Sequence, residues 1–97
     1  MAQIRWTLEA QRWLEDIFEF ISVENPEAAS RTISGIFDRA QILADHPEVG
    51  YRYSVSNRYV RILLYGHYRI TYLVSDDGNV DILGVFHSAL DLNRYEL

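Results

Sequence analysis

The stretch that decides the fold is YVRILLYGHYRITYLVSDDGNVDILGVFH, residues 59–87. It contains three apolar runs, at residues 60–64, 68–75 and 80–86, that are rich in the β-branched and aromatic side chains typical of strands. The turn segments YGH and DDG separate these runs. The stretch therefore predicts a three-stranded antiparallel meander.

The second turn decides which side chains share a face of this sheet. A three-residue Asp-Asp-Gly loop, with the glycine in the left-handed conformation, would pair Ser75 with Asn79. A two-residue turn would instead place Arg69 and His87 on opposite faces. We favour the three-residue loop because it separates core from polar residues better. The core face then carries Ile70, Tyr72, Val74, Ile82 and Phe86, and the opposite face carries Arg69, Thr71, Leu73, Asp81, Leu83, Val85 and His87. The register of the first hairpin stays open, so the face of Arg61 is not predicted.

Two helices are expected before the meander. Apolar residues recur at helical spacing over residues 8–24 and again over residues 26–43. Thr7 is a suitable N-cap for the first helix, and Asn25 followed by Pro26 suits the start of the second. Two helices joined by a few residues form an antiparallel hairpin, and the apolar stripe of this one is wide enough to need a sheet against it.

These elements predict a single α+β domain over residues 1–97, in the order β-α-α-β-β-β, with the helix hairpin packed on one face of an antiparallel sheet. The first strand is expected at residues 3–6. No apolar run approaches the ~20 residues of a membrane span, and the N-terminus lacks the pattern of a secretory signal. We therefore expect a cytoplasmic protein. Without cysteine, and with three scattered histidines, we expect neither a metal site nor a cofactor.

Charge is distributed unevenly along this acidic chain. The formal net charge is −5, and all nine basic residues are arginines. Residues 9–48 hold nine acidic and three basic side chains, whereas residues 51–75 hold four arginines and no acid. A protein that binds nucleic acid through many phosphates is usually basic overall. The sheet nevertheless gains a local positive field.

Taken in order, several stretches resemble the RelE/ParE superfamily of bacterial toxins from type II toxin–antitoxin modules. They are WTLEAQRWLEDIFEFI, ILADHPEVG, HYRITYLVSDDG and VDILGVFHSALDL. The resemblance is closest to the ParE-like branch, in which a strand-final V-x-H is followed by a small residue and Asp, as in VFHSALD. It implies a toxin that inhibits DNA gyrase by binding and arrests growth. It also implies a heteromeric complex with a small, DNA-binding, partly disordered antitoxin.

The ribonuclease branch of the same superfamily implies a different activity, cleavage of mRNA on the ribosome. Carried over to this chain, Arg69 matches the phosphate-binding arginine, His87 the general acid and, loosely, Glu48 the base. The chain departs from the YoeB-like pattern, because Ser88 follows His87 where that pattern has tyrosine. A degenerate, non-toxic antitoxin-binding module is a further alternative.

The open face of the sheet is the expected binding surface for antitoxin or target. It is predicted to contain Arg61, Arg69, Leu73, Leu83, Val85 and His87. An acidic or amphipathic antitoxin segment that folds on binding would suit its arginines. Purely structural roles stay open: Arg69 is equally well explained as an ion-pair partner of Asp81 or Asp91, and His87 as a cap of the turn that follows.

Overall fold

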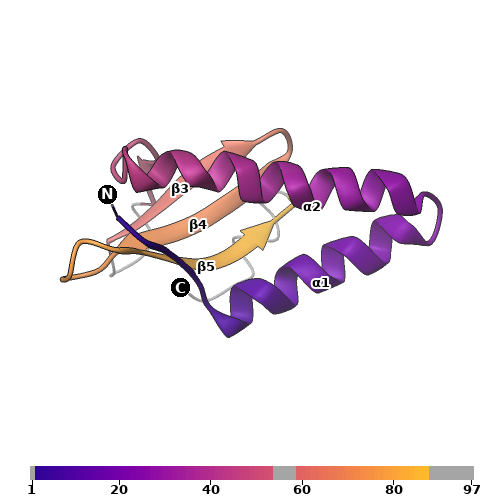
Figure 1. The fold of residues 1–97 in the computed structure, drawn as a ribbon, viewed down its shortest axis with the longest axis horizontal. Helices are drawn as coiled ribbons and strands as arrows, with labels where there is room; N and C mark the ends of the chain where they lie inside the picture. Colours follow the sequence, from indigo (N-terminus) through magenta and orange to yellow (C-terminus); the bar gives the residue numbers. More distant parts are fainter. Residues whose placement is uncertain (1, 54–58, 88–97) are drawn as a thin grey trace.

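The computed structural model describes residues 2–53 and 59–87. Its elements are β1 (Ile4–Trp6), α1 (Leu8–Ser22), α2 (Pro26–Ala40), the 3₁₀ helix η1 (Gln41–Ala44), β2 (Tyr51–Arg52), β3 (Val60–Tyr65), β4 (Tyr68–Val74) and β5 (Val80–Phe86). Figure 1 shows the two long helices side by side, with β3 and β4 passing behind α2. The α+β class and the predicted element order are confirmed, while β2 and η1 are additions.

The strands form one five-stranded sheet in the order β1-β5-β4-β3-β2. The meander is antiparallel, as predicted, but β1 runs parallel to β5. The sheet is therefore mixed, not wholly antiparallel. Parallel pairing requires a long connection between the two strands, and here both helices and the first two strands of the meander lie between β1 and β5.

Both predicted helix caps are present. The Thr7 hydroxyl oxygen accepts a hydrogen bond from the backbone N–H of Ala10 at 3.2 Å, and the Asn25 side chain accepts one from Ala28 at 3.0 Å. The Thr7 hydroxyl also donates to the carbonyl oxygen of Ile82 at 2.7 Å. The same residue thus begins α1 and fixes that helix to β5.

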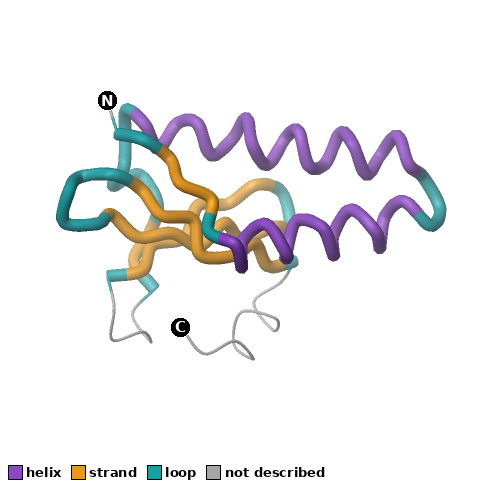
Figure 2. The backbone as a smooth tube through the Cα atoms, turned by 60° about the horizontal axis from the view of Figure 1, so that its bottom comes forward, coloured by secondary structure: helices purple, strands orange, loops and turns teal. Residues whose placement is uncertain are grey.

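The main core lies between the helices and one face of the sheet (Figure 2). Its buried members come from both helices, from η1 and from the three long strands: Ala10, Leu14, Ile36, Leu43, Leu63, Ile70, Tyr72, Val80, Ile82 and Val85. Burial of this apolar surface is the dominant favourable contribution to folding.

The turn between β4 and β5 has the predicted form. The backbone N–H of Ser75 donates to the carbonyl oxygen of Asn79 at 2.8 Å, and Gly78 has a φ of 84°. Glycine tolerates this left-handed conformation because it has no Cβ. The three-residue loop is therefore confirmed.

Beyond this turn, β5 carries a β-bulge that the sequence did not predict. Tyr72 pairs with Ile82, but the preceding residue, Thr71, pairs with Gly84. Leu83 is therefore an extra residue in β5. An extra residue moves every later side chain of a strand to the other face.

The faces predicted for the end of β5 are consequently wrong. Val85 pairs with Ile70 and is fully buried against the helices, although it was expected on the open face. Phe86 was expected in the main core, but it pairs with Arg69 on the opposite face. There Phe86 joins a smaller cluster in which the ring of Trp13 lies 4.6 Å from its own.

The first hairpin, whose register was left open, turns at Gly66 and His67. Gly66 has a φ of 57°, which suits the first central position of a type II′ hairpin turn. In this register Arg61 pairs with Tyr72 and lies on the helix side of the sheet. Arg61 and Arg69 are therefore on different faces.

A buried hydrogen bond joins the sheet to the segment before β2. The backbone N–H of Gly50 donates to the Tyr72 hydroxyl at 2.9 Å, and both residues are buried. A Cβ on residue 50 would lie 2.7 Å from the carbonyl oxygen of Ile62. Only glycine fits here without displacing backbone. Burial also raises the pKa of the Tyr72 hydroxyl.

We predict that Tyr72→Phe destabilises the fold by about 1–3 kcal/mol, because the buried Gly50 N–H loses its acceptor. Unfolding in urea, followed by circular dichroism, measures the change. Tyr51→Phe is the matched control, since Tyr51 is 49% exposed. Equal stability of the Tyr72→Phe variant and the wild type would contradict the assigned role of this hydrogen bond.

Candidate functional site

The residues predicted to form a nuclease site are not brought together. Arg69 lies on the face of the sheet turned away from the helices. His87 lies on the helix side, and its ring is 5.2 Å from that of Tyr68, at the start of β4. Glu48 shares a cleft with Val74, at the other end of β4. The three side chains therefore cannot act on one phosphate in this structure.

The predicted binding face is divided in the same way. Arg61, Val85 and His87 lie on the helix side of the sheet, whereas Arg69 and Leu73 lie on the other. Val85 is fully buried. These residues therefore do not make one continuous patch.

Asp81 is paired with Arg5, not with Arg69. The Arg5 Nε donates to an Asp81 oxygen at 2.6 Å, and Nη1 donates to Asp77 at 2.8 Å. Nη2 donates to the Ser75 hydroxyl at 2.6 Å. The guanidinium thus joins β1 to the β4–β5 turn and to β5. Asp91, the other proposed partner of Arg69, lies outside the described residues.

This contact lowers the pKa of Asp77 well below its usual range, chiefly through the hydrogen bonds from Arg5 and then through that from Ser75. A carboxylate with a depressed folded-state pKa stabilises the fold above its unfolded-state pKa, about 3.9 for Asp, and loses that contribution as the pH falls further. The pair is solvent-exposed, so salt screens it.

We predict that Asp77→Asn lowers the melting temperature at pH 6 and that this difference shrinks as the pH falls below about 3.9. Thermal unfolding across this pH range measures it. Asp76→Asn is the matched control, because Asp76 is the exposed neighbour in the same turn. A difference between Asp77→Asn and wild type that stays constant with pH would contradict the role of the Arg5 contact.

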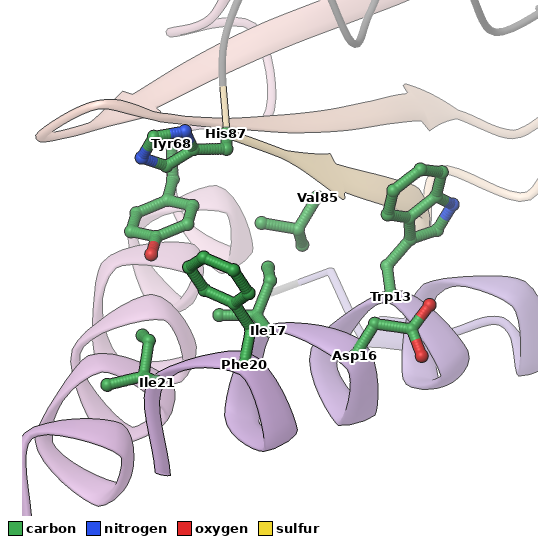
Figure 3. A pocket seen from close by; sticks show the side chains of 8 residues that line it. All are labelled: Trp13, Asp16, Ile17, Phe20, Ile21, Tyr68, Val85 and His87. Atoms are coloured by element: carbon green, nitrogen blue, oxygen red, sulfur yellow. The ribbon is translucent and has the colours of Figure 1, made fainter. Parts of the chain in front are cut away.

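An apolar groove lies between α1 and the sheet, near the end of β5 (Figure 3). It has a volume of about 580 Å³. The lining residues are Trp13, Asp16, Ile17, Phe20 and Ile21 from α1, together with Tyr68, Val85 and His87 from the sheet. The Phe20 ring points into the groove and is 84% exposed. The groove and this open aromatic ring together make a candidate site for a partner.

One of the groove residues, His87, has a second histidine close to its ring. The ring of His67, in the β3–β4 turn, lies 6.3 Å from that of His87. His87 was a predicted site residue, whereas no functional role was predicted for His67, Tyr68 or Phe20. Phe20 carried a usable signal, because it lies outside the apolar stripe of its helix. The contact between the two histidines could not be predicted without the bulge.

Within residues 2–53 and 59–87, no three histidine, aspartate or glutamate side chains are grouped closely enough to hold a metal ion. In the same part of the chain, no helix combines the length and the apolar character that crossing a membrane requires.

The fold is that of known toxins from toxin–antitoxin systems. The chromosomal ParDE system from P. aeruginosa superposes with a TM-score of 0.78 at 21% identity, over 91% of this chain and 97% of that one. The toxin–antitoxin complex RelBE2 from Mycobacterium tuberculosis gives a TM-score of 0.59 at 24% identity, over 89% and 96% of the two chains. At these identities the likeness shows the fold alone.

The sequence comparisons identify the family. A family model described as the ParE toxin of the type II toxin–antitoxin system parDE matches residues 4–92. A protein of Sinorhizobium fredii, named "Putative toxin Y4kP", is 35% identical over 86 residues, which are 89% of this chain and 88% of that protein. The chain therefore belongs to the ParE family of type II toxins, and the resemblance to the RelE/ParE superfamily is confirmed.

Proposed function

We propose that this toxin acts by binding its target, DNA gyrase, and not by cutting RNA. The observation that carries the proposal is the separation of Arg69 from His87 by the thickness of the sheet. Cleavage of a phosphodiester by 2′-OH attack needs an acid, a base and a cation around one phosphate. The ParE family match supports gyrase as the target.

We expect the purified chain to inhibit supercoiling by gyrase and to trap cleaved DNA in the presence of ATP. The same preparation should leave mRNA on ribosomes intact. Agarose gels measure the first effect, and primer extension on ribosome-bound message measures the second. Unaffected gyrase together with mRNA cuts that disappear in His87→Ala would establish the ribonuclease alternative instead.

Growth of a bacterial host after induction distinguishes a toxin, whether it inhibits gyrase or cuts mRNA, from a non-toxic antitoxin-binding module. Growth arrest that the co-expressed antitoxin relieves supports a functional toxin. A folded chain that arrests neither growth nor gyrase would be a non-toxic antitoxin-binding module, and it would overturn the proposal.

The groove beside α1 is the proposed site for an antitoxin segment. Support comes from the exposed Phe20 ring and from the similar solved structures, which are toxin–antitoxin systems. The exposed side of α1 next to the groove carries three acidic side chains, Glu9, Asp16 and Glu19, and one basic side chain, Arg12, at helical spacing. An apolar segment with flanking basic residues is complementary to this surface. This differs from the acidic segment that the arginines alone suggested.

We predict that Phe20→Ala weakens binding of the cognate antitoxin about 30-fold or more, as loss of a central aromatic anchor does. The fold should be unaffected, because the ring is 84% exposed. Titration calorimetry measures the affinity, and thermal unfolding checks the fold. Leu8→Ala is the matched control on the same helix, 64% exposed and outside the groove. Wild-type affinity in Phe20→Ala would rule out the groove as the antitoxin site.

A further inference from the structure

A second candidate site lies at the other end of the sheet from the groove. It is a cleft of about 290 Å³ lined by Glu48, Arg52, Tyr59, Arg61 and Val74. None of these residues lines the apolar groove. The cleft is also independent of the Arg5 network, which takes its carboxylates from the β4–β5 turn and from β5.

The cleft contains two arginines that face each other across a strand pair. Arg52 in β2 is directly opposite Arg61 in β3. Like charges at opposed positions destabilise a sheet. Among the described residues, neither guanidinium forms an ion pair that would relieve this repulsion. Glu48 lines the same cleft, but it contacts Arg61 through its backbone carbonyl oxygen, at 3.2 Å.

The two guanidiniums are held by different contacts. Arg61 Nη1 donates to the carbonyl oxygens of Gly50, at 2.7 Å, and Glu48, which fixes the group in place. The Arg52 guanidinium lies 5.2 Å from the centre of the Tyr59 ring. The second contact is a cation–π interaction. A fixed cation beside a stacked one is a suitable arrangement for binding an anion with several oxygens.

The exposure of the Tyr59 ring indicates which kind of anion the cleft binds. The residue is 77% exposed even though Arg52 covers part of its ring. An open aromatic ring beside paired guanidiniums combines a stacking surface for a base with a binding site for a phosphate. Sites for single-stranded nucleic acid have this combination. An acidic peptide would use the arginines but would leave the ring without a stacking partner.

The charge distribution makes such contact possible in an acidic protein. Residues 51–75 hold four arginines and no acid, whereas residues 9–48 carry nine acidic and three basic side chains. Two of these four arginines, Arg52 and Arg61, line the cleft and give it a local positive field.

We propose that the cleft of Arg52, Tyr59 and Arg61 binds single-stranded DNA, with one phosphate between the guanidiniums and a base on the open part of the tyrosine ring. The inference rests on the proposed function only for the source of the DNA, which would be strands exposed in a gyrase–DNA complex. Binding of free DNA can be measured without gyrase, so the two proposals fail separately.

The test is fluorescence anisotropy of a labelled oligothymidylate with the full-length chain at low salt. We expect Arg52→Gln and Tyr59→Ala each to weaken binding about tenfold. Arg52→Gln should also reduce the slope of log affinity against log salt by about 0.7, the value for one phosphate of a single strand. Arg31→Gln is the matched control, because it makes the same charge change at an exposed position of α2.

Three outcomes would overturn the proposal. One is absence of oligothymidylate binding by the wild-type chain. Another is an equal loss of affinity in Arg31→Gln and Arg52→Gln, which would indicate nonspecific electrostatic attraction of DNA to the protein and no specific site. The third is displacement of the DNA by a poly-glutamate peptide of equal length, with Tyr59→Ala having no effect, which would assign the cleft to an acidic peptide. Thermal unfolding of each variant confirms that it is folded.

Discussion

The extra residue in β5 is the constraint on which the arrangement of both faces depends. Leu83 has no partner in β4, so the residues after it change sides. The Thr71 hydroxyl stabilises this geometry by donating to the carbonyl oxygen of Gly84 at 3.0 Å. Gly84 also leaves room on its face, since a Cβ there would lie 3.0 Å from the Phe86 ring and 3.4 Å from that of Trp13. The bulge thus allows an aromatic pair to pack on the face away from the main core.

The sequence predicted most of the fold because its local signals are strong. Thr7 and Asn25 cap their helices through the expected side-chain oxygens, and Gly78 fits a left-handed position that few other residues tolerate. Each of these features depends on a few neighbouring residues. The parallel pairing of β1 with β5 depends instead on segments that are far apart in the sequence, so no local pattern could show it.

The faces at the end of β5 could not be predicted for a different reason. The sequence ILGVF has apolar residues at both alternating and adjacent positions. Either assignment of these residues to the two faces of the sheet therefore buries apolar side chains in the core. Val85 and Phe86 are both fully buried, one on each side of the sheet. Because both side chains are apolar, exchanging their faces puts no polar residue into the core, and the sequence gives no sign that the predicted faces are wrong. The prediction that Arg69 and His87 share a face failed at this point.

The chain presents surfaces of opposite charge at the two ends of β4. Near Tyr68 an apolar groove adjoins the acidic side of α1, and near Val74 a cleft holds two opposed arginines. One antitoxin segment that is basic and apolar complements the first surface but is repelled by the second. A nucleic acid complements the second and is repelled by the first. The antitoxin segment proposed for the groove therefore need not cover the arginine cleft, which lies at the other end of the same side of the sheet.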